Sequence, residues 1–179
     1  MSVDFPSVAY PGLRFMPGEE TWFDELDLPE QVEPFDFLLD QQVTQDDVNV
    51  QKAARFLDQI KQHYQEALAY VKAVVADEAH ADHQSLASFV DFHLTELDLQ
   101  SQQAIFEVED VHDLSLDDVT EYLLLVGVSA YMHMYPSAEG EKPGLVFVMD
   151  LSLDPEYSDE ILAVYFDADF RILGLEHED

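Results

Sequence analysis

Residues 145–153 of this 179-residue chain read Leu-Val-Phe-Val-Met-Asp-Leu-Ser-Leu. Every second residue is large and apolar, which is the pattern of a β-strand with one buried face. The same alternation predicts further strands at 128–135, 161–166 and 171–176, the last two joined by a short turn at 167–170. We therefore expect the C-terminal part of the chain to form an antiparallel meander of about four strands.

Ahead of this meander, apolar residues recur every three or four positions, which predicts amphipathic helices. The longest such pattern covers 46–77, and a second covers 84–98. A third helix is predicted to begin at Ser115, whose hydroxyl can cap the first turn, and to run to about Leu125. The expected fold class is α+β, with three helices packed on one face of the meander and the other face in water.

The length fits one domain, since domains average roughly 150 residues. Residues 1–43 contain five of the eight prolines and are predicted to form an irregular acidic arm packed on the core, with a short strand at 21–28. Residues 44–179 are expected to form a single α+β domain. Within it, residues 136–143 are predicted to form a turn-rich loop.

The charge balance is extreme: 39 Asp and Glu stand against 7 Lys and Arg, a formal net charge of −32. With 47% apolar residues, the chain can still fill a core, which argues against disorder. The scarcity of Lys and Arg excludes binding to nucleic-acid phosphates or to an anionic membrane. The lack of cysteine excludes disulfides and thiolate metal sites.

The N-terminus is acidic and leads into no apolar segment of signal-peptide type. The longest apolar run, residues 122–128, is far too short to cross a bilayer. We therefore expect a cytoplasmic protein that does not enter the membrane.

Two acidic segments stand out as candidate binding surfaces. Residues 107–121 carry seven acids, and no Lys or Arg occurs between 73 and 141, although a solvated surface normally intersperses both signs. Such dense like charge destabilises a fold, so we expect a basic protein partner to offset it. A charge that serves only solubility or salt adaptation is the alternative.

The second acidic segment lies in the N-terminal arm, where Trp22, Phe23, Phe35 and Phe37 stand among acids. Aromatic residues inside a charged rim are typical of interface hot spots, but for most of these four we favour a role as core anchors of the arm. The predicted partner-binding residues of the two segments are Glu107, Glu109, Asp110, Asp113, Asp117, Asp118 and Glu121, together with Asp24, Glu25, Asp27, Glu30, Glu33 and Asp36.

Histidines supply three further candidates. His80 and His83 lie among acids and would share a helix face, as metal ligands do, but without a third ligand in the sequence we favour a solvated helix end and loop. His93 falls on the apolar face of the second helix and is predicted to be a hydrogen-bonded core histidine. His133 shares one face of its strand with Tyr131 and Tyr135, either as surface aromatics or as part of a contact patch.

The C-terminal stretch from Asp150 to Asp167 resembles an uncharacterised family of small bacterial proteins, known only as a domain of unknown function. In size, charge and architecture the chain is also similar to the small acidic immunity proteins encoded beside bacterial toxins. Neither resemblance implies catalytic residues. The positions that carry the first resemblance are Leu153, Asp154, Pro155, Glu156, Ser158, Asp159, Phe166 and Asp167.

No phosphate-binding glycine loop and no G-x-S-x-G motif is present, so we expect neither an enzyme nor a cofactor. The leading hypothesis is an acidic inhibitor, most specifically an immunity protein that neutralises a basic bacterial toxin by covering its active site. A nuclease toxin would suit, because its active site must be basic to hold phosphate. The alternatives are a DNA-mimicking inhibitor of a DNA-binding protein and a housekeeping domain.

Overall fold

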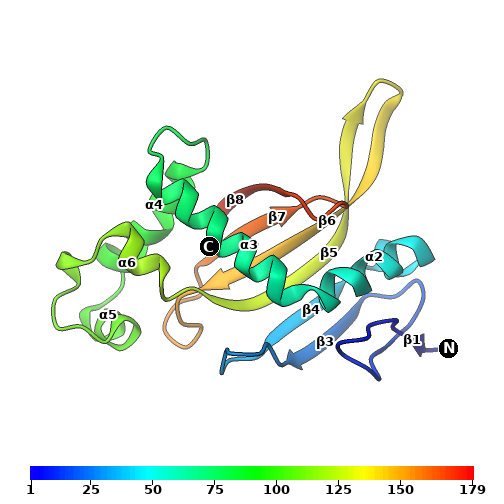
Figure 1. Ribbon diagram of the computed structural model, residues 1–179, viewed down its shortest axis with the longest axis horizontal. Coiled ribbons are helices and arrows are strands. Elements are labelled where there is room, and N and C mark those ends of the chain that lie inside the picture. The colour runs from blue at the N-terminus through cyan, green and yellow to red at the C-terminus, as the bar shows by residue number, and fades with distance from the viewer.

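The computed structural model describes residues 1–179, which form an α+β protein built on a six-stranded sheet (Figure 1). Its strand order is β3-β4-β5-β6-β7-β8, and all neighbours are antiparallel except β4 and β5, which run parallel. A separate two-stranded ribbon joins β1 (Val3–Asp4) to β2 (Arg14–Phe15). The six strands are β3 (Thr21–Leu26), β4 (Phe35–Leu39), β5 (Leu124–Ser137), β6 (Gly140–Ser152), β7 (Ile161–Phe166) and β8 (Ile172–Glu178).

Strands β5 to β8 form the predicted antiparallel meander. The prediction of a loop at 136–143 was wrong, because β5 and β6 continue as a hairpin in which Ser137 pairs with Gly140. Gly140 has a φ of +107°, a backbone conformation that side chains disfavour, and it makes this tight turn feasible. The hairpin extends beyond the rest of the sheet (Figure 1).

The N-terminal arm is less irregular than predicted, because β3 and β4 extend the sheet from residues 1–43. The strand predicted at 21–28 is present as β3, whereas β4 was not predicted. Gln31, in the turn between them, binds both backbone groups of Leu125: its Nε2 donates to the carbonyl at 2.7 Å and its Oε1 accepts from the amide at 2.9 Å. This side chain ties the turn to the start of β5.

The helix predicted at 46–77 is divided in two at Gln59, whose φ of −106° and ψ of 18° leave the helical region. The helix predicted at 84–98 ends earlier than expected and continues as a π-helical turn, η1 (Phe92–Glu96). The full set comprises six α-helices rather than three: α1 (Gln41–Thr44), α2 (Asp47–Asp58), α3 (Ile60–Ala76), α4 (His83–Asp91), α5 (Leu99–Phe106) and α6 (Leu116–Thr120).

The start of the third predicted helix is confirmed, but its end is not. Ser115 and Asp118 form a reciprocal capping box at the N-terminus of α6. The helix ends at Thr120, because Leu124 already belongs to β5 and pairs with Ser152. Strand pairing in the sheet therefore prevails over the helical pattern in this segment.

Helices α2 and α3 cross one face of the sheet and bury it (Figure 1). At the centre, the ring of Phe56 stacks on Phe147 with centroids 4.1 Å apart and on His63 at 4.3 Å. One continuous apolar core includes residues from Phe5 to Leu175, so both ends of the chain pack on the same sheet. None of the helices is both long and apolar enough to span a membrane.

Candidate functional site

The second face of the sheet has no helix packed on it, and we call it the open face. Its own small apolar cluster consists of Val146, Val148 and Ala163, which are buried only by strand residues such as Tyr131 and Tyr165. The open face therefore presents strand side chains directly to the surroundings over all six strands.

Strand register arranges these side chains in rows. Asp36 pairs with Gly127, Gly127 with Asp150, Asp150 with Ala163, and Ala163 with Glu176. Carboxylates on β4, β6 and β8 thus alternate with small residues on β5 and β7, and alternate strands lie about 10 Å apart. We call Asp36, Asp150 and Glu176 the carboxylate row. The adjacent row across the same strands is Trp22, Leu38, Ser129, Val148, Tyr165 and Gly174.

Most of the basic residues lie elsewhere; Lys142 is the exception on the six strands, where it is the cross-strand partner of Tyr135 and pairs with Glu139. None of the three acids in the carboxylate row forms an ion pair; Asp36 only accepts a hydrogen bond from the backbone amide of Glu25. Helices α2 and α3, on the opposite face, carry four of the seven cations. Those four are Lys52, Arg55, Lys61 and Lys72.

Asp150 lies at the centre of the row, in a shallow hollow of about 180 Å³ that Trp22 and Asp36 also line. Burial raises the pKa of Asp150 to about 7, and the negative charge of Glu178 adds to the shift. Trp22 stands beside this hollow with 54% of its surface exposed, an unusual position for an aromatic residue of that size. This part of the open face combines an exposed indole with two acids.

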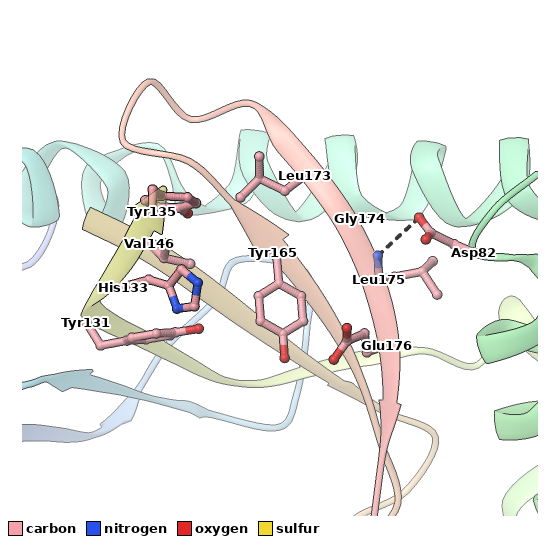
Figure 2. A pocket seen from close by; sticks show the side chains of 10 residues that line it. All are labelled: Asp82, Tyr131, His133, Tyr135, Val146, Tyr165, Leu173, Gly174, Leu175 and Glu176. Carbon is pink, nitrogen blue, oxygen red and sulfur yellow. Dashed lines mark hydrogen bonds between the residues drawn. The ribbon is translucent and has the colours of Figure 1, made fainter. Parts of the chain in front are cut away.

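A larger pocket of about 470 Å³ opens on the same face beside the hairpin (Figure 2). Tyr131 and His133 enter it from β5, Tyr165 from β7 and Glu176 from β8, with the polar ends of Tyr131, Tyr165 and Glu176 along one side. We call it the tyrosine pocket. Its full lining is Asp82, Tyr131, His133, Tyr135, Val146, Tyr165, Leu173, Gly174, Leu175 and Glu176.

Two acids, Asp82 and Glu176, line the tyrosine pocket. The hydroxyl of Tyr165 donates a hydrogen bond to Glu178, and burial, that bond and Glu176 together raise the pKa of Tyr165. Burial also raises the pKa of Tyr131, with smaller contributions from Tyr135, Glu178 and Glu176. Burial disfavours any charge there, whereas the neighbouring carboxylates of Glu176 and Glu178 oppose only a negative one and would favour a cation.

The predicted acidic run at 107–121 lies at the other end of the molecule, around α5, η2 (Val111–Asp113) and α6, far from the hairpin (Figure 1). Part of it serves local structure. Asp110 accepts from the amide of His112 at 3.0 Å, and bonds from Ser115 lower the pKa of Asp118. The exposed side chains of Glu109, Asp113 and Asp117 have no such role.

The N-terminal acids divide between two surfaces. Asp36 belongs to the carboxylate row, whereas Glu30 and Glu33 line a groove of about 620 Å³ beside α3 that Glu121 also lines. In this groove the two predicted acidic segments meet. Its charge is partly neutralised, since Lys61 pairs with Glu30 at 3.1 Å and Lys72 with Glu121 at 2.9 Å. The remaining acids, Asp24, Glu25 and Asp27, are exposed on β3 and just after it.

His80 and His83 lie in the turn before α4 and at its first residue, not on a common helix face. His83 Nδ1 donates to the carbonyl of Val74 at 3.0 Å, and His80 Nδ1 accepts from the amide of Asp82 at 3.1 Å. The fold brings no group of three or more potential metal ligands together. Both histidines thus stabilise the connection between α3 and α4 through hydrogen bonds to the backbone.

His93 is a buried, hydrogen-bonded core histidine, as predicted. Its Nδ1 lies 2.8 Å from the carbonyl of Phe89 and must carry the proton, so Nε2 accepts from the hydroxyl of Ser158, also at 2.8 Å. This pair has the spacing of a nucleophile and its base. However, His93 has no exposed surface that a substrate could reach, and we assign the pair a structural role.

The sequence alone predicted part of the side-chain arrangement on the open face. It placed Tyr131, His133 and Tyr135 on one strand face, and all three line the tyrosine pocket. It missed the carboxylate row, because Asp150 and Glu176 become neighbours of Asp36 only through strand register. No local sequence signal marks that relationship.

No protein-family model, no curated protein and no solved structure matches the chain. The resemblance between residues 150–167 and a bacterial family stays a prediction. Its polar positions have local roles here: Asp154 accepts from the amide of Glu156, Asp167 accepts from the amide of Arg171, and Ser158 binds His93. Function is therefore inferred from the geometry and charge of this chain.

Proposed function

We propose that this chain is an acidic binding protein that docks its open face on a basic protein and covers the positively charged site of that partner. The observation that supports the proposal is the carboxylate row, which has no paired cation and lies beside exposed Trp22 and half-buried Tyr165. A toxin-neutralising immunity protein would act in this way, and it remains the most specific version of the proposal.

The carboxylate row and the adjacent row, which contains Trp22 and Tyr165, would contribute differently to binding. Aromatic side chains that become fully buried supply most of the affinity of a typical interface. Uncompensated carboxylates speed the encounter with a basic surface and reject acidic proteins. Because the cations lie on α2 and α3, a basic partner would be guided toward the open face and away from the helices. Inhibition would be steric and electrostatic, without a chemical step.

Capture from the native cell lysate tests this proposal. The tagged full-length chain is compared with two variants of equal charge change: Asp36→Asn/Glu176→Gln on the open face and Asp113→Asn/Asp117→Asn in the acidic run. Each capture is washed at low salt and at about 0.5 M salt, where screening leaves only contacts within a few Å. We expect the wild type and the acidic-run variant to retain one basic protein that the open-face variant loses.

The captured protein is then purified and titrated calorimetrically with the same three chains. Neutralising a hydrogen-bonded charge inside an interface costs about 2–5 kcal/mol, and neutralising a rim charge costs much less. Retention of the partner by the open-face variant, together with its loss by the acidic-run variant, would move the contact surface to residues 107–121. If no protein survives the 0.5 M wash with the wild type, the proposal is wrong.

A further inference from the structure

The tyrosine pocket has the composition of a site for an organic cation. Tyr131, Tyr135 and Tyr165 present half-buried rings around a floor that includes Val146, and Glu176 closes one side (Figure 2). The face of an aromatic ring attracts a cation placed within about 6 Å of its centre, and the attraction grows where water is excluded. A pocket with aromatic walls and a carboxylate therefore selects for positive charge.

Two glycines give the pocket its shape. A β-carbon at position 144 would come within 2.7 Å of the ring of Tyr135, so Gly144 lets this ring lie against the hairpin backbone. Gly174 is the cross-strand partner of Tyr165 and puts no side chain beside that ring. The carboxylate of Asp82 borders this space, with Oδ2 3.3 Å from the point where a β-carbon at position 174 would be.

No lysine or arginine lines the tyrosine pocket. Glu176 makes no hydrogen bond or ion pair within the protein, while Glu178 accepts only from the hydroxyl of Tyr165. The carboxylate of Glu176 is therefore free to accept hydrogen bonds from a ligand. Its volume of about 470 Å³ falls in the range of small-ligand sites.

We propose that the tyrosine pocket takes the guanidinium group of an arginine side chain presented by the basic partner, an inference that rests on the proposed function. Guanidinium suits the pocket better than ammonium does, because it is flat, weakly hydrated and stacks on aromatic rings. Its five donors can also bind the carboxylate of Glu176 while one face contacts Tyr165.

The test uses the isolated full-length chain and small probes, so it does not depend on a partner. Nα-acetyl-arginine amide, its lysine counterpart and uncharged Nα-acetyl-citrulline amide are each titrated into ¹⁵N-labelled protein and followed by NMR. We expect arginine to shift the amides of Tyr131, Tyr165 and Glu176 and to bind several-fold more tightly than lysine or citrulline. Tyr165→Leu and Glu176→Gln should each weaken arginine binding about threefold or more.

Matched substitutions in the loop between β6 and β7, Tyr157→Leu and Glu156→Gln, should leave arginine affinity unchanged. Glu176 is exposed, so Glu176→Gln stays informative even if loss of the Tyr165 ring disturbs the sheet. Arginine that binds no more tightly than citrulline or lysine, or that binds both pocket variants like the wild type, would overturn the proposal.

The result separates this proposal from the proposed function. If the arginine probe fails while open-face charge reduction still abolishes partner capture, the face binds its partner without filling the pocket. If the probe binds but no basic partner is captured, the pocket is a cation site and the proposed function is wrong.

Discussion

The carboxylate of Asp150 on β6 lies over Gly127, its cross-strand partner on β5, with Oδ2 3.2 Å from the point where a β-carbon at position 127 would be. The missing side chain makes room for a half-buried acid that receives no hydrogen bond from the protein. Burial raises the pKa of this acid, at the centre of the carboxylate row, to about 7.

Replacing Asp150 with asparagine should remove a pH dependence of stability. The folded carboxyl keeps its proton up to about pH 7, whereas the unfolded one loses it near 3.9, so the free energy of unfolding falls as pH rises between these values. We expect Asp150→Asn to be more stable than the wild type at pH 8, by roughly 4 kcal/mol, and similar to it only near pH 4. Urea unfolding at both pH values measures this, and an equal difference at both would contradict it.

Two buried serines should respond in opposite ways to alanine. Ser158→Ala leaves Nε2 of His93 buried without a donor and should cost about 1–3 kcal/mol. Ser152 is also buried, but its hydroxyl has no partner, so Ser152→Ala should be neutral or stabilising. Urea titrations of the two variants at neutral pH provide the comparison. Equal destabilisation by the two substitutions would contradict the expected contrast.

His63 should make the protein less stable in mild acid. It stacks on Phe56 with its Nε2 buried and unpartnered, and burial lowers its pKa despite the opposing contact with Glu66. The unfolded chain therefore binds the proton more readily, and stability falls as pH drops below about 6.5. Thermal unfolding between pH 7.5 and 5 should show this loss in the wild type and less of it in His63→Phe.

Exposed His112 provides the control for this measurement. His112→Gln should leave the pH dependence of the wild type unchanged. If His63→Phe loses as much stability in acid as the wild type does, another group causes the acid sensitivity.

Asp82, positioned by a hydrogen bond from Tyr70, should stabilise β8 at the edge of the sheet. The hydroxyl of Tyr70 donates to Asp82 at 2.5 Å, and the same carboxylate accepts from the amide of Leu175 at 3.3 Å. Tyr70→Phe should cost about 1–2 kcal/mol and speed hydrogen exchange at Leu175 relative to β5. Exchange followed by NMR measures both sites, and Tyr157→Phe should change neither. Uniform acceleration across the sheet would indicate global rather than edge loosening.

Local patterns were enough to predict part of the fold. The period of two placed β7 at its observed bounds, and Ser115 was correctly predicted to cap α6. The apolar stripe around His93 predicted its burial. Each of these features depends on neighbours within a few positions along the chain, so the sequence carries a direct signal for it.

Other features depend on contacts between distant segments. β4 pairs in parallel with β5, about 90 residues away, and Leu124 joins this strand although its neighbours continue a helical pattern. With only five residues, β4 is too short for its pattern to be recognised alone, although four of the five are large and apolar. Its position follows from burial of Phe35, Phe37 and Leu39 in the shared core.

The composition alone established the excess negative charge and the scarcity of cations that could balance it. Which surface carries the unpaired acids, and could therefore meet a partner, depends on the fold. Strand register aligns Asp36, Asp150 and Glu176 across three strands, and helix packing places the cations of α2 and α3 on the opposite side. The physical reason is that a β-strand has two faces, and only its pairing partners and the helices packed on the sheet determine which one stays open.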